Sequence, residues 1–222
     1  MLPNGQAIVI DMAVRAVDDP LLTRYRAGLL LGALREDVAY IPATRVVFPR
    51  LSFTHFYKPG LPGGLVPFVT RGPRRRTNAL VARAVAAYTR GGAGIAIIAL
   101  GRAAHLLVDM ACPVHSHRTV HFIDDPYEWY VEGNAAALHA LPVPAWPERA
   151  RPSELVDDLA RYAQRFAPDG TRSPWGRLLR RLGVRQALTT AAIAEQARAL
   201  IPAAAAATAS LFRLFLREAK LR

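Results

Sequence analysis

Residues 105–117 read HLLVDMACPVHSH and place three histidines and an aspartate in a short stretch of a chain that has only 6 histidines. His105 and Asp109 are four residues apart, so on a helix their Cβ atoms lie about 5–6 Å apart on one face. The rest of that face is apolar, and burying an unpaired carboxylate there costs free energy. A shared cation would remove that cost, although a hydrogen-bonded pair explains the same spacing.

The composition limits what kind of protein this is. With 222 residues, 52% of them hydrophobic, the chain can bury one sizeable core, and we expect a single domain over residues 1–222. The single cysteine, Cys112, excludes an intramolecular disulfide and any cysteine-rich zinc module. A metal site would therefore have to use histidine, aspartate and glutamate.

The net charge of +12 favours phosphate-bearing partners, either nucleic acid or an anionic membrane surface contacted peripherally. Much of this charge is arginine in an Ala/Arg/Leu-rich sequence, and a genomic bias would produce the same excess. A basic helical protein that binds nucleic acid or membrane is one hypothesis for the function.

The N-terminus indicates a cytoplasmic protein, because Asp11 and Arg15 interrupt the first apolar stretch before a secretory signal could form. A truncated start would leave secretion open. The apolar runs at 91–100 and 199–212 reach roughly half of a membrane span and are flanked or interrupted by charged residues or proline. We expect no transmembrane segment.

Apolar residues recur at helical spacing through most of the chain, which predicts an all-α fold of several helices. Asp19-Pro20 and Ser173-Pro174 are typical helix starts, and Ser153 is a third candidate cap. The expected helices cover residues 6–17, 20–35, 76–89, 92–110, 126–141, 153–166, 174–182 and 184–216, and Pro202 is a point at which the last one could kink.

Residues 36–76 are different, because they are rich in proline, glycine and aromatic residues and have no helical period. A long loop of this kind in a compact domain is usually functional. It contains His55, and Asp37 lies where the preceding helix ends. After Pro113 follow His115, His117 and His121, and then Asp124, Asp125 and Glu128. Imidazole and carboxylate groups are the zinc ligands to expect where thiolates are absent.

Three blocks together resemble the zinc-dependent phospholipase C family, whose superfamily also contains the single-strand-specific zinc nucleases of fungi and plants. The first block is GALREDVAYIP (32–42) with FTHFYKPG (53–60), the second is ALGRAAHLLVDMACPVHSH (99–117), and the third is DPYEWYVE (125–132). They cover residues 30–134, which would form the metal-site core, with C-terminal helices over 153–218.

The resemblance implies two zinc ions. One would be held by Asp37, His55, His105 and Asp109, and the other by His115, Glu128 and a further histidine. We favour His121 for that position, with His117 and Asp124 as alternatives. In the family a third zinc uses a histidine on the first helix, but Gln6 stands at that position here and no tryptophan lies near the N-terminus. We therefore expect the third site to be lost or replaced.

The implied activity is phosphodiester hydrolysis by a metal-activated water, which Asp37 could also orient or deprotonate. The substrate would be a phospholipid headgroup or a nucleotide. Phe56, Tyr57, Trp129 and Tyr130 could stack on a base or enclose choline, although core packing is the simpler role for Phe56 and Trp129. We interpret His139 and Cys112 as structural. A degenerate relative that binds metal without robust catalysis is the main alternative function.

Overall fold

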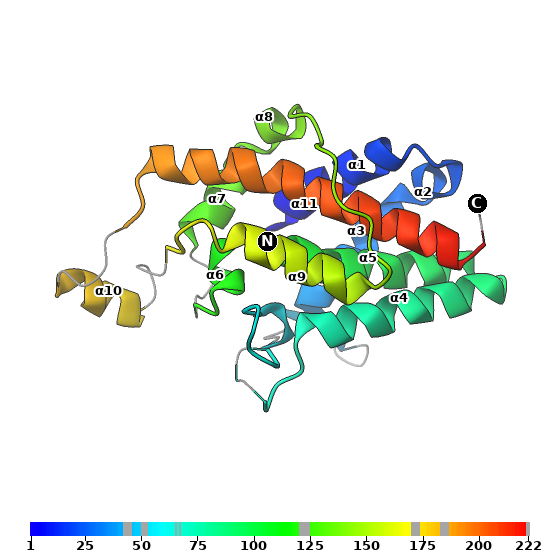
Figure 1. Ribbon diagram of the computed structural model, residues 1–222, viewed down its shortest axis with the longest axis horizontal. Helices are drawn as coiled ribbons and strands as arrows, with labels where there is room; N and C mark the ends of the chain where they lie inside the picture. Colours follow the sequence, from blue (N-terminus) through cyan, green and yellow to red (C-terminus); the bar gives the residue numbers. More distant parts are fainter. Residues whose placement is uncertain are drawn as a thin grey trace.

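The computed structural model describes residues 1–41, 46–49, 53–64, 66, 68–119, 125–169, 174–182 and 187–220 (Figure 1). The helices are α1 (Pro3–Val17), α2 (Pro20–Arg24), α3 (Arg26–Asp37), α4 (Pro73–Thr89), α5 (Ala93–Asp109), α6 (Pro113–Ser116), α7 (Pro126–Gly133), α8 (Ala135–His139), α9 (Pro152–Ala163), α10 (Pro174–Arg181) and α11 (Thr190–Glu218), with a 3₁₀ turn η1 (Phe53–His55). The all-α fold class predicted from the periodicity is confirmed.

One short hairpin lies in the segment expected to be a loop. Strands β1 (Val38–Ile41) and β2 (Val46–Pro49) pair antiparallel, with Val38 opposite Pro49. Each strand has four residues, mostly β-branched or aromatic. Such short strands give too few alternations for the period of two to be visible in the sequence.

The core is organised around α11 and α5. Helix α11 packs against α1, α5 and α9, and small alanine side chains fill its central part at residues 203–207. By length and composition α11 could cross a membrane, but 89% of its most apolar window is buried inside the bundle. The central helix of a helical bundle meets the same criteria, so its apolar character is explained by core packing.

Helix α5 is positioned by a very close crossing with α3. A Cβ atom on Gly101 would lie 2.1 Å from the carbonyl oxygen of Leu29, and one on Gly32 would lie 2.3 Å from that of Ile98. Only glycine allows the two backbones to approach this closely. Helix α4 packs on α5 as well, so α5 is held firmly, with His105 and Asp109 in its last two turns.

Helix ends follow the predicted signals in part. The Asp19 side chain accepts a hydrogen bond from the Leu21 amide, as expected for a cap, but the predicted helix 20–35 is divided at Tyr25 into α2 and α3. The prediction of Ser153 as a cap is wrong. Helix α9 begins one residue earlier, where the Glu154 side chain accepts from the Arg151 amide, and the Ser153 amide donates to Asn78 Oδ1 at 2.8 Å. Ser173, the other serine predicted as a cap, lies outside the described residues.

Candidate metal centre

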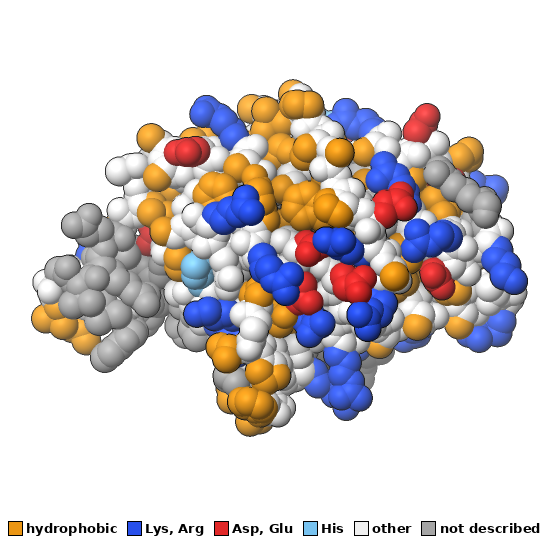
Figure 2. All heavy atoms as spheres, in the orientation of Figure 1, with side chains coloured by type: hydrophobic (Ala, Val, Ile, Leu, Met, Phe, Trp, Pro, Cys, Tyr) orange, Lys and Arg blue, Asp and Glu red, His pale blue; other side chains and the backbone are white. Residues whose placement is uncertain are grey.

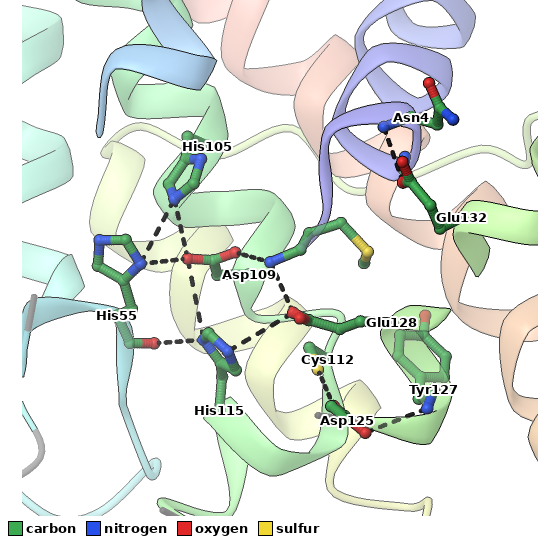
Figure 3. Close-up of polar contacts among 12 residues, drawn as sticks. Asn4, His55, His105, Asp109, Cys112, His115, Asp125, Tyr127, Glu128 and Glu132 are labelled. Carbon is green, nitrogen blue, oxygen red and sulfur yellow. Dashed lines mark hydrogen bonds and ion pairs between the residues drawn. The ribbon is translucent and has the colours of Figure 1, made fainter. Parts of the chain in front are cut away.

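Side chains from four separate segments meet at the end of α5 (Figure 3). His105 and Asp109 come from the last turns of α5, His55 from the end of η1, His115 from α6 and Glu128 from the first turn of α7. Proline at the first helical position and the Asp125 cap, which accepts from the Tyr127 amide at 3.1 Å, fix where α7 starts. All five side chains are buried.

The first group of potential ligands surrounds Asp109. Its Oδ2 atom lies 2.8 Å from His55 Nδ1 and 3.1 Å from His105 Nε2. The two imidazole nitrogens are 3.4 Å apart. Donor atoms of all three residues therefore lie within 4.8 Å of one another, which is the arrangement of ligands that share one cation.

The second group is adjacent to the first. His115 Nε2 lies 3.8 Å from Glu128 Oε1, and His115 Nδ1 lies 3.8 Å from Asp109 Oδ2. His115 Nδ1 is also 3.2 Å from the backbone carbonyl oxygen of His55. Together with Cys112, His115 and Glu128 form a second buried cluster of donor atoms that could hold a metal ion.

The N-terminal amine extends the same polar cluster. It lies 2.9 Å from Asp109 Oδ1 and 2.7 Å from Glu128 Oε1. Gln6, one turn further along α1, is completely buried, and neither its amide nitrogen nor its amide oxygen has a hydrogen-bond partner among the described residues. Amides are poor zinc ligands, so the Gln6 side chain fits a third zinc badly.

The hydrogen bonding of Asp109 tests whether a metal ion fits these residues. Its Oδ2 atom is buried and makes no hydrogen bond within the described part of the chain, although two imidazole nitrogens lie within 3.1 Å. A buried carboxylate oxygen without a hydrogen bond is costly. A cation shared with the two imidazoles would satisfy it, and the donor set of two imidazoles and one carboxylate suits zinc.

The charge state of Asp109 also suits a metal ligand. Burial alone would raise the pKa of this carboxyl group, but the positive charges of His105, the N-terminal amine, His115 and His55 together lower its pKa well below the ordinary value. Asp109 is therefore held as a carboxylate, which is the form that coordinates metal.

Cys112 is the member of the second group that the sequence analysis did not include. Its buried Sγ atom donates a hydrogen bond to Asp125 Oδ2 at 3.1 Å, and burial raises the pKa of the thiol well above its ordinary value. The structural role predicted for Cys112 agrees with this hydrogen bond, yet the side chain also lies within ligand reach of His115 and Glu128. The sequence feature that could have predicted this proximity is the position of Cys112 three residues before His115, at the start of α6.

Five of the predicted zinc ligands are brought together: His55, His105, Asp109, His115 and Glu128. Asp37 ends α3, but its side chain is outside the described part of the structure, as are His121 and Asp124. His117 does not join the cluster, since its Nε2 atom lies 3.1 Å from the backbone carbonyl oxygen of Phe166.

The aromatic residues differ from one another in their surroundings. Phe56 is buried as expected and stacks on His115, with ring centroids 5.0 Å apart. The Tyr57 hydroxyl donates to Asp157, and burial together with this hydrogen bond raises the pKa of Tyr57 to about 12. The prediction that Trp129 packs in the core is wrong, because its side chain is 53% exposed.

Comparisons with known proteins identify the fold. No family model and no curated protein sequence matches the chain. The alpha-toxin of Clostridium perfringens, avian strain SWCP, superposes with a TM-score of 0.71 at 14% identity, over 98% of this chain and 64% of the toxin chain. The alpha toxin of Clostridium absonum gives 0.70 at 15% identity, over 98% and 66%. The chain thus spans slightly less than two thirds of each toxin, and it has the all-α phospholipase C-type fold expected from its three sequence blocks.

Proposed function

We propose that this chain is a zinc-dependent phosphodiester hydrolase of the phospholipase C type. The observation that carries the proposal is the gathering of five buried ligand side chains from four separate segments at the end of α5. The fold shared with the two alpha-toxins also supports it. In addition, the three sequence blocks that suggested the family contribute these same five side chains.

In this proposal the first zinc is held by His55, His105 and Asp109, and the second by His115 and Glu128. We propose Asp37 and His121 as the remaining ligands. Bound zinc would lower the pKa of a coordinated water to about 7 and neutralise charge on the phosphoryl group.

The side chains of the chain itself would fix the ligands and limit access of solvent. The buried setting makes charge interactions stronger than they are in water. Stacking of Phe56 on His115 and the contact between His115 Nδ1 and the His55 carbonyl oxygen hold the His115 ring in a defined orientation. The carboxylate state of Asp109 removes the need to displace a proton from this ligand when metal binds.

One observation favours a second candidate, a metal-binding relative without robust catalysis. Gln6 occupies the position at which the family would have a histidine ligand, and its buried side chain has no hydrogen-bond partner among the described residues. If hydrolysis requires a third zinc, this substitution would abolish turnover while leaving the other two sites able to bind.

The deciding experiment measures metal content and hydrolysis together. Protein purified without added zinc is analysed by mass spectrometry for metals and assayed on bis(p-nitrophenyl) phosphate, before and after chelation. We expect two zinc ions per chain and chelator-sensitive turnover. His105→Ala should lose at least one ion and reduce turnover by about 100-fold or more.

His139→Ala is the matched control, because His139 pairs with Asp11 away from this cluster. It should keep both metal and turnover, and circular dichroism checks that each variant folds. Bound zinc without hydrolysis of any diester would support the second candidate, whereas a folded protein that binds no metal would refute both. Phosphatidylcholine and single-stranded DNA, tested as substrates in parallel, distinguish a phospholipase from a nuclease.

A further inference from the structure

Residues 60–64, 66 and 68–72, called here the apolar loop, present large hydrophobic side chains to solvent. Phe68 is 85% exposed and Val69 is 78% exposed, and Leu61 and Val66 are also exposed. In Figure 2 hydrophobic side chains gather at the lower end of the molecule, where Figure 1 places this segment, with Lys and Arg side chains nearby. Exposed apolar groups that form a cluster mark an interaction site more often than isolated ones do.

The apolar loop is closed by its own hydrogen bonds. The Gly64 amide donates to the Thr70 carbonyl oxygen at 2.8 Å, and the Thr70 hydroxyl donates to the Val66 carbonyl oxygen at 3.0 Å. At its base, one guanidinium nitrogen of Arg118 donates to the carbonyl oxygens of Leu61, Pro62 and Gly63 at 2.9–3.1 Å. These hydrogen bonds connect the described parts of the loop that carries the exposed side chains.

The backbone of Phe68 is strained. Its φ of +62° is in the left-handed region, which is uncommon and strained for a bulky residue. Such strain persists where the surrounding structure enforces it, and it clusters at functional sites. In this conformation the Phe68 side chain is exposed to solvent, so its apolar surface does not stabilise the fold by burial.

Basic residues lie directly beside the apolar tip. Arg71, Arg74 and Arg75, at the end of the apolar loop and the start of α4, are exposed. Together with Phe68 and Val69 they line a cavity of about 540 Å³. Arg74 is partly neutralised by Asp157 at 3.1 Å. The surface thus combines an apolar tip with a positively charged hollow that could receive a phosphate group.

We propose that the apolar loop docks the chain on an anionic lipid bilayer. Phe68 and Val69 enter the boundary between headgroups and acyl chains, while Arg71 and Arg75 pair with lipid phosphates. A bilayer fits better than single-stranded nucleic acid, because the tip has aliphatic side chains and one aromatic ring, whereas binding of bases relies on several stacking rings. This docking requires neither bound zinc nor hydrolysis.

Docking here would bring the metal centre close to the membrane. His55 precedes the apolar loop by five residues, and Arg118, which clamps its base, follows His115 by three. The Tyr57 amide also donates to the His115 carbonyl oxygen at 3.0 Å. The segment that leads from His55 into the loop is thus hydrogen-bonded to the backbone of His115, a second potential zinc ligand.

The test is co-sedimentation of the full chain with vesicles of phosphatidylcholine and phosphatidylserine in a 7:3 ratio. Phe68→Ser/Val69→Ser should weaken binding by about tenfold or more, as expected when two apolar side chains no longer enter the bilayer. Ile95→Ser is the matched control, because Ile95 is 58% exposed on α5 away from the loop, and it should change binding less than about twofold.

Arg71→Ala/Arg75→Ala should weaken binding to these vesicles by about tenfold and should change binding to pure phosphatidylcholine little. Leu178→Ser/Leu182→Ser tests a second exposed basic and apolar segment, which consists of α10 and the residue that follows it. Wild-type affinity in the Phe68→Ser/Val69→Ser variant, loss of binding only in the α10 variant, or binding of single-stranded DNA without binding of vesicles would each overturn the proposal. Hydrolysis of the soluble diester, measured on the same variants, keeps this outcome separate from that of the proposed function.

Discussion

At the scale of single residues, Asp109 has the largest set of charged partners in the metal centre. Its two oxygen atoms lie within 3.1 Å of His55, His105 and the N-terminal amine. In the metal-free protein the carboxylate forms a buried ion pair with the N-terminal amine, and with metal bound it would be a ligand. Its removal should therefore affect stability as well as metal binding.

We predict that Asp109→Asn lowers the free energy of unfolding of the metal-free protein by about 3 kcal/mol at pH 7, the cost of leaving buried charges without their partner. The pKa of Asp109 is lower in the folded than in the unfolded chain. Its contribution is thus fully present above the unfolded-state pKa of about 4 and is lost as the pH falls through the folded-state pKa. The difference from wild type should shrink in strong acid.

Urea unfolding at pH 7 and at pH 3 measures this effect. Asp158→Asn is the control, because Asp158 forms a surface ion pair with Arg149 and should contribute less than about 1 kcal/mol. Equal stabilities of Asp109→Asn and wild type at pH 7 would show that the Asp109 carboxylate has no such compensating role.

The sequence predicted individual site residues well where local geometry determines their position. The spacing of His105 and Asp109 fixes them on one face of any helix, so their proximity required no tertiary information. Trp129 shows the limit. On α7 the buried residues are Tyr127, Glu128 and Val131, and Trp129 lies about 100° around the helix from Glu128, on the outer face. Composition alone favoured burial of a tryptophan but could not identify which face of α7 packs.

At the scale of elements, α3 and α5 cross at a very short distance, which the pattern of apolar residues did not predict. Gly32 and Gly101 allow close contact between the two backbones, and Gly28, one helical turn before Gly32, leaves room for the Ile97 side chain. Periodicity identified both helices but said nothing of their separation. The glycine spacing was visible in the sequence, but its meaning depended on knowing which helix lies opposite.

We predict that Gly101→Ala destabilises the chain by about 3 kcal/mol or more, because the added methyl group would overlap the Leu29 carbonyl oxygen and force the helices apart. Gly94→Ala in the same helix is the matched control, since a Cβ atom added at Gly94 would meet nothing within 4 Å. It should be neutral or stabilising by up to about 1 kcal/mol. Thermal unfolding of both variants measures the difference, and equal effects would contradict a tight crossing.

At the scale of the whole molecule, the metal centre brings together side chains from several separate secondary-structure elements. Its side chains come from η1, α5, α6 and α7, and the N-terminal amine also contacts it. The sequence predicted that these segments lie close together in space only when the three sequence blocks were considered in combination. No local signal places His55 beside His105, because fifty residues, including the whole of α4, separate them.

Because a metal ion would bind only when these segments are assembled, we predict that bound zinc stabilises the entire fold. At a free zinc concentration of 100 times the dissociation constant, the gain is about 2.7 kcal/mol for one site. For a chain of this size that corresponds to roughly 5–10 °C in Tm. Scanning calorimetry with zinc and with a chelator measures the shift. Metal binding requires deprotonated ligands, so the gain should be smaller at acidic pH than at pH 7. His105→Ala should show a much smaller chelator effect, and an unchanged Tm of the wild type after chelation would show that the assembled site does not couple metal to folding.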